Sequence, residues 1–121
     1  MQPEVKKNNV APEFETEERC YIAEIANDSG DEYVSISRAR VKPGVTTTWH
    51  KLKGVTERYI IISGQGLVEI DDLDPIDVIE GDIVRIPADT PQRITNTGKI
   101  DLIFYAVCSP RFKNNCYVSL E

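Results

Sequence analysis

The amino-acid sequence predicts an all-β protein with a single domain. Its aliphatic residues are mostly β-branched, since 14 Ile and 11 Val stand against 5 Leu. Such side chains pack well on a pleated sheet and are less favoured in helices. Seven glycines and seven prolines, spread along the chain, supply turns. The 121 residues favour one hydrophobic core over two.

Short apolar segments follow one another between clear turn signals. The turns near 27–30, 42–44, 64–66, 71–75 and 97–98 are rich in Asn, Asp, Gly, Pro, Ser or Thr, which favour turn geometry. The pattern between them predicts eight to ten strands at a spacing of roughly 8–12 residues, as in a sandwich or barrel. The expected strands are 20–25, 32–41, 46–52, 57–63, 67–70, 76–79, 83–87, 92–96 and 101–109.

The first 18 residues differ from the rest in being polar. They carry Pro3 and Pro12 and show no sustained alternation. Such a composition favours loose chain over a packed element. We therefore expect a flexible N-terminal arm at 1–18 and a folded domain at 19–121.

Charge and cysteine content exclude several classes of protein. The net charge of −6 argues against a nucleic-acid partner, which needs clustered Lys and Arg. No apolar run approaches the ~20 residues of a membrane-spanning helix, so we expect no membrane partner. No secretory signal is apparent near the N-terminus. Cys20, Cys108 and Cys116 show no C-x-x-C spacing, and we expect reduced thiols in a cytoplasmic protein.

Residues 44–64 contain a histidine and a glutamate at defined distances from two glycines. Gly44 is followed after five residues by His50, and Leu52 stands two positions further on. Glu57 comes after four more residues, and Gly64 after another six. His50 is the only histidine of the chain, so its neighbours decide how it is interpreted.

A second spaced segment covers residues 81–96. Gly81 is followed after five residues by Pro87, then by Gln92 and, after three more residues, by Asn96. Sixteen residues separate this segment from the first. In order and spacing the two segments resemble the two motifs of the cupin superfamily. Four of five fixed positions match in the first motif and three of five in the second.

The resemblance implies a fold and a cofactor. Cupins are small jelly-roll β-barrels (double-stranded β-helices), here expected over 19–121, and many form dimers. Their motifs supply His, His, Glu and His to a divalent metal in the barrel. Leu52 replaces the second His and Gln92 the last. The remaining candidate ligands for Zn, Ni, Mn or Fe are His50, Glu57 and Gln92, and the candidate catalytic residues are Glu57 and His50.

Other interpretations of these three residues remain open. His50 and Gln92 can hydrogen-bond Glu57 directly, which would make a metal-free polar pocket for a ligand. A collapsed core without a site is the third alternative. Because side chains alternate along a strand, residues two positions from these three would also face the pocket. The pocket candidates are Tyr59, Leu52, Thr48, Ile94, Asn96 and Tyr105, although Asn96 also suits a turn cap and Tyr105 faces opposite to Cys108.

These features predict a metal-dependent enzyme, an isomerase, epimerase or lyase, acting on a small polar metabolite such as a sugar derivative or small acid. The alternative is a metal-free cupin that binds a small molecule without catalysis. A phosphate ligand is disfavoured because alternation turns Arg58, Arg85 and Arg93 away from the pocket. The segment 58–62 is apolar on both faces, so we expect a homodimer that covers the outer one.

Overall fold

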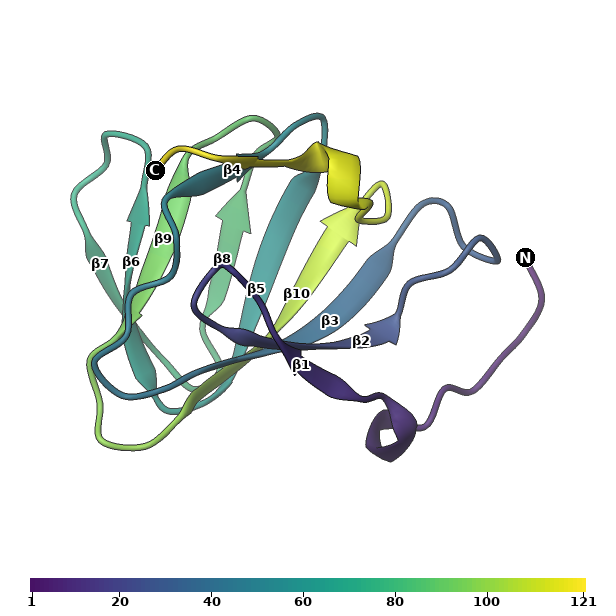
Figure 1. Cartoon of the computed structure of the whole chain (residues 1–121), viewed down its shortest axis with the longest axis horizontal. Coiled ribbons are helices and arrows are strands. Elements are labelled where there is room, and N and C mark those ends of the chain that lie inside the picture. The colour runs from purple at the N-terminus through teal and green to yellow at the C-terminus, as the bar shows by residue number, and fades with distance from the viewer.

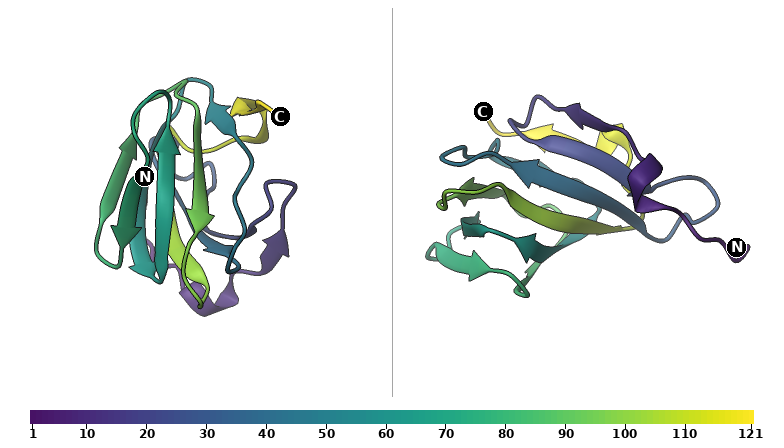
Figure 2. Two further views of the ribbon diagram at one scale, coloured as in Figure 1. Left: turned by 90° about the vertical axis from the view of Figure 1, so that its left-hand side faces the viewer. Right: turned by 90° about the horizontal axis from the view of Figure 1, so that it is seen from below.

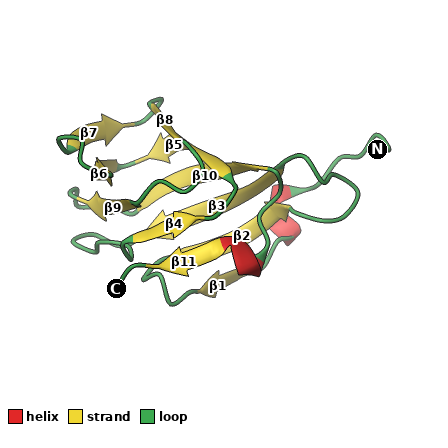
Figure 3. Ribbon diagram, turned by 90° about the horizontal axis from the view of Figure 1, so that it is seen from above, coloured by secondary structure: helices red, strands yellow, loops and turns green.

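Two antiparallel β-sheets face each other in the computed structural model of the protein (Figure 1). The structure describes residues 1–121, apart from the side chain of Asn9. The prediction of an all-β jelly-roll fold is confirmed. The regular structure is almost entirely strand, with two short 3-10 helices, η1 (Asn8–Val10) and η2 (Asn114–Cys116) (Figure 3).

The larger sheet has six strands in the order β1-β2-β3-β10-β5-β8. Their bounds are Glu13–Glu15, Tyr21–Ala26, Ser35–Val41, Leu102–Ser109, Thr56–Ser63 and Ile83–Ile86. The smaller sheet has the order β11-β4-β9-β6-β7. Its strands are Tyr117–Ser119, His50–Leu52, Gln92–Asn96, Gln65–Ile70 and Ile76–Ile79. The right-hand view of Figure 2 shows the two termini at opposite ends of the molecule.

Alternation along the central strands creates the core between the sheets. In β10, Leu102, Phe104, Ala106 and Cys108 are buried, while the residues between them are half-buried. Because β10 pairs with both β3 and β5, its inward side chains meet those of segments more than 40 residues away in the chain. The alternation of inward and outward side chains along each strand thus gives the sheets one common hydrophobic core.

The motif glycine Gly64 serves the turn between β5 and β6. Its φ of +85° lies in the left-handed region, which other residues rarely adopt. A Cβ atom there would lie 2.7 Å from the carbonyl oxygen of Asp101. Glycine is therefore required both for the turn and for the close approach of the chain that leads into β10.

The N-terminal segment contributes more structure than its composition indicates. Within the expected arm, β1 pairs antiparallel with β2, with Phe14 opposite Ile22. The connection turns back at Thr16, whose hydroxyl accepts a hydrogen bond from the backbone N–H of Glu18. The Thr16 N–H also donates to the carbonyl of Cys20. Of the side chains after β1, Thr16 and Glu18 are consequently half-buried against the barrel, while Glu17 and Arg19 are exposed.

Two other segments differ from the expected strands. Within 46–52 only His50–Leu52 is a strand, and Thr46 forms an isolated bridge with Thr95. Thr47 and Thr48 are both buried, so strict alternation fails before His50. In the tail, β11 pairs with β4 and sets Ser119 opposite His50. No helix in the described chain combines the length and the apolar character needed to cross a bilayer.

Candidate functional site

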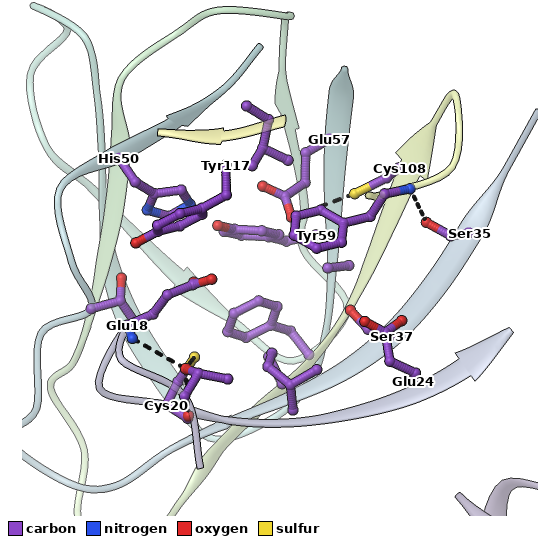
Figure 4. A pocket seen from close by; sticks show the side chains of 18 of the residues that line it. Glu18, Cys20, Glu24, Ser35, Ser37, His50, Glu57, Tyr59, Cys108 and Tyr117 are labelled. Carbon is purple, nitrogen blue, oxygen red and sulfur yellow. Dashed lines mark hydrogen bonds between the residues drawn. The ribbon is translucent and has the colours of Figure 1, made fainter. Parts of the chain in front are cut away.

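A cavity of about 340 Å³ lies between the two sheets, on the side of β2, β3 and β10 (Figure 4). Its volume lies at the lower end of the range of small-molecule sites, roughly 300–1,000 Å³. Alternate residues of five strands line it. They are Ile22 and Glu24 of β2, Ser35, Ser37 and Ala39 of β3, His50 and Leu52 of β4, Glu57 and Tyr59 of β5, and Phe104, Ala106 and Cys108 of β10.

A hydrogen-bonded chain of three side chains includes Glu57. The Gln92 Nε2 donates to Glu57 Oε1 at 2.7 Å, and the Tyr59 hydroxyl donates to Gln92 Oε1. Cys108 Sγ donates to the other Glu57 oxygen at 3.8 Å. Gln92 is 1% exposed and Glu57 8% exposed. The amide of Gln92 is therefore oriented by an acceptor on one side and a donor on the other.

Burial changes the acidity of the groups in this chain. It raises the pKa of Glu57 to about 7, although the hydrogen bonds from Gln92 and Cys108 act in the opposite direction. It also raises the pKa of the Tyr59 phenol well above its usual value, so Tyr59 stays a donor. Glu57 consequently exchanges its proton near neutral pH, in contact with the cavity.

His50 faces the cavity from β4 with one ring nitrogen already occupied. Its Nδ1 lies 2.6 Å from the carbonyl oxygen of Thr48, and because a carbonyl only accepts, Nδ1 carries the proton. Nε2 is therefore an acceptor. The ring stacks on Tyr117, with centroids 5.1 Å apart. Burial lowers the pKa of His50, which keeps the ring neutral at neutral pH.

The turn between β1 and β2 brings a second carboxyl into the cavity. Glu18 points toward the interior in the close-up view and shares the cavity with Glu57 (Figure 4). Burial, together with the like charge of Glu57, raises the pKa of Glu18 to about 7. Sequence reasoning missed Glu18, because a polar segment before the first strand carries no alternation that would mark one side chain as inward.

The structure brings four of the sequence-predicted residues to the cavity wall: His50, Glu57, Leu52 and Tyr59. The fifth, Gln92, is paired with His50 in the sheet and sits next to Glu57 and Tyr59 through its hydrogen bonds. Both motifs therefore converge on one place, although His50 and Gln92 are 42 positions apart in the chain.

Four predicted pocket residues lie elsewhere. Thr48 does not line the cavity: its hydroxyl donates to the carbonyl of Glu17, and Thr47 lines the cavity instead because alternation is broken there. Ile94 packs inside the main hydrophobic core. The remaining two do not line the cavity either: Asn96 is engaged in a turn, and Tyr105 lies on the outer face of β10.

Asn96 holds a turn together. Its Nδ2 donates to the carbonyls of Val41 and Ile100 at 2.8 Å each, and its Oδ1 accepts from the Gly98 N–H. Tyr105 points to the outer face of β10, because Phe104 and Ala106 on either side point inward. Of the two candidates on that strand, Cys108 is the one that lines the cavity.

Comparison with known proteins identifies the family. The sequence model of the Cupin domain matches residues 37–108. The chain belongs to the cupin family. An uncharacterised protein of Methanocaldococcus jannaschii is 32% identical over 87 residues, which are 72% of this cupin and 69% of that protein.

Solved structures share the fold of this cupin. A predicted oxalate decarboxylase from Thermotoga maritima superposes with a TM-score of 0.79 at 21% identity, over 88% of this chain and 99% of that one. KdgF from Halomonas sp. gives a TM-score of 0.79 at 16% identity, over 90% and 96% of the two chains. At such low identity the likeness extends to the fold alone.

The residues present do not fit the metal site that the cupin motifs imply. Of the three candidate ligands, Gln92 has its amide oxygen engaged by Tyr59 and presents its N–H₂ group to Glu57. An N–H₂ group cannot bind a cation, and Leu52 has no donor atom. His50 and Glu57 remain, which is fewer than the three protein ligands of usual transition-metal sites. Across the described residues, no three His, Cys, Asp or Glu side chains are grouped to hold a metal.

Proposed function

We propose that this cupin binds a small polar molecule in its barrel cavity and does so without a resident metal ion. The observation that carries the proposal is the chain from Tyr59 through Gln92 to Glu57. In this chain the Gln92 side chain points its N–H₂ group, and not its metal-binding oxygen, at the Glu57 carboxylate, the position where cupins hold a metal. Among the alternatives raised by the sequence, this favours the metal-free pocket over the metal-dependent enzyme.

Polar groups that face the same space support a binding role. The Nε2 of His50 and the carboxyls of Glu18 and Glu57 adjoin the cavity, and apolar or aromatic side chains form much of the remaining wall. A concave, largely apolar site with a few convergent polar groups is the usual form of a small-molecule site.

Acid–base catalysis is the second candidate, favoured by the protonation properties of two groups that line the same cavity. Glu57 has a pKa of about 7, and His50 is neutral with a free acceptor nitrogen. Isomerases, epimerases and lyases move protons on and off carbon, and such steps need groups poised near the working pH. A sugar derivative suits this role better than a small acid, because no Lys or Arg is found among the described residues of the cavity wall.

Metal content distinguishes the metal-free proposal from the usual cupin chemistry. We expect protein purified without an affinity tag to carry well under one equivalent of Zn, Ni, Mn or Fe by plasma mass spectrometry. Calorimetric titration with the same four ions should then show no saturable binding. One equivalent in the wild type that is lost in His50→Ala would refute the proposal, and Glu80→Gln, a change at an exposed carboxyl outside the cavity, is the control.

We also propose that this cupin forms a homodimer through the outer face of β5 and β8. Ile60 pairs with Ile83 on that face, and Ile62 and Ile83 are exposed. Covering such side chains with a second copy would remove apolar surface from water. Light scattering coupled to size exclusion should give twice the chain mass of 13.6 kDa, and Ile83→Lys should shift it toward the monomer.

A further inference from the structure

The charge of the cavity wall has one sign. Glu17, Glu18, Glu24 and Glu57 line it, and the described lining includes no Lys or Arg. Glu17 and Glu24 are exposed at the mouth, while Glu57 lies deep. The partners of Glu57 are an amide and a thiol, neither of which carries positive charge. A buried carboxylate is costly as an anion unless hydrogen bonds or a countercharge offset its loss of hydration, and the described part of this wall supplies no positively charged side chain.

Two hydrogen-bond acceptors of the cavity wall receive no hydrogen bond from another described residue. The Nε2 of His50 has no hydrogen-bond partner among the described residues, although His50 is 4% exposed. The carboxyl of Glu18 likewise has none. Together with Glu57, these acceptors face the cavity, whose described wall offers only neutral donors such as the hydroxyls of Ser37 and Tyr117. A ligand that fills it well must therefore bring N–H or O–H groups.

Aromatic rings complete the wall. Phe14, Tyr59, Phe104, Phe112 and Tyr117 all line the cavity, and the rings of Tyr59 and Phe104 lie 4.4 Å apart between centroids. The faces of aromatic rings attract cations, more strongly where water is excluded. A cavity lined by both carboxylates and aromatic rings is thus suited to an organic cation, whose carbon atoms contact the rings while its charge meets the acids.

We propose that the ligand of this cavity is a small organic ammonium ion, which donates to Glu18, Glu57 and the Nε2 of His50 and packs its carbon skeleton against the surrounding aromatic rings. The inference rests on the proposed metal-free binding function and names its ligand class. It also accounts for a buried carboxyl, Glu57, and a half-buried one, Glu18, that share the cavity, because binding a cation favours their ionised forms.

Three probes of nearly equal shape isolate the charge. 3,3-Dimethylbutylammonium, 3,3-dimethylbutan-1-ol and 3,3-dimethylbutanoate share a branched alkyl group and carry charges of about +1, 0 and −1 at neutral pH. We expect the ammonium to bind at least about tenfold more tightly than the alcohol, and the carboxylate not to saturate. Calorimetry gives the affinities, and the amide resonances of residues around the cavity place the site.

Variants tie the preference to one carboxyl. Glu18→Gln keeps the shape of the side chain and should weaken the ammonium at least about tenfold while leaving the alcohol unchanged. Glu80→Gln removes the same charge from an exposed position and should have no effect.

The outcomes separate this inference from the proposed function. If the alcohol binds in the cavity as tightly as the ammonium, the ligand is not a cation, whereas metal-free binding stands. Tighter binding of the carboxylate, or an unchanged ammonium affinity in Glu18→Gln, also overturns the inference. If none of the three probes shifts the amide resonances around the cavity, the inference is also overturned. The proposed metal-free function is then tested by the metal measurements alone.

Discussion

Replacing Glu57 by glutamine should make this cupin more stable at high pH and leave it unchanged at low pH. Burial raises the pKa of Glu57 from its usual 4.5 to about 7. The folded protein therefore binds this proton more tightly than the unfolded chain does. Stability from the group is fully present below about pH 4.5 and is lost as the pH rises through 7.

The magnitude follows from the two pKa values. A difference between 4.5 and about 7 corresponds to about 3 kcal/mol in the free energy of unfolding by pH 8, at about 1.4 kcal/mol per pKa unit. Glutamine has the shape of the protonated carboxyl, and its oxygen can still accept from Gln92 Nε2. Glu57→Gln should thus gain about 3 kcal/mol at pH 8, equivalent to about 10 °C in melting temperature for a chain of this size.

Urea unfolding at pH 4.5, 6, 7 and 8, followed by circular dichroism, measures the effect directly. The difference between Glu57→Gln and the wild type should be small at pH 4.5 and should grow through the range in which Glu57 ionises. Glu80→Gln, at an exposed position, is the matched control and should show no such trend. A difference that is the same at all four pH values would show that Glu57 is not held neutral, and the reasoning would be wrong.

Three further predictions test the site and the fold. Leu52→His places a second imidazole on the face of β4 that carries His50. Calorimetry should then detect Ni²⁺ or Zn²⁺ binding that the wild type lacks. If no binding is gained, the lack of a donor at position 52 is not what prevents metal binding. Ile61→Ala opens a cavity in the core and should cost about 2–5 kcal/mol in urea unfolding, whereas Ile79→Ala, at an exposed position of β7 outside the proposed dimer face, should cost under about 1 kcal/mol. Asn96→Ala removes three hydrogen bonds of a buried side chain and should cost about 2–4 kcal/mol; a loss under about 1 kcal/mol would contradict the assigned role of this side chain.

The sequence by itself determined the fold and the centre of the site. Alternating β-branched residues between turn signals predicted an all-β chain, since a period of two is a local property of a strand. The spacing of the two motifs predicted a cupin barrel and singled out His50, Glu57 and Gln92. Substitution of the second motif histidine by Leu52 was visible in the same pattern.

Tertiary structure decided what these residues face. Cross-strand pairing set the Gln92 amide between Glu57 and Tyr59 with its oxygen already engaged, and the turn after β1 delivered Glu18. The tertiary structure also decided between the two roles open to Asn96, whose side chain bonds to a turn and does not line the cavity. Side chains from distant segments meet only through sheet register and turn geometry, which no local period encodes. The acidic character of the cavity is a property of that assembly and not of any one motif.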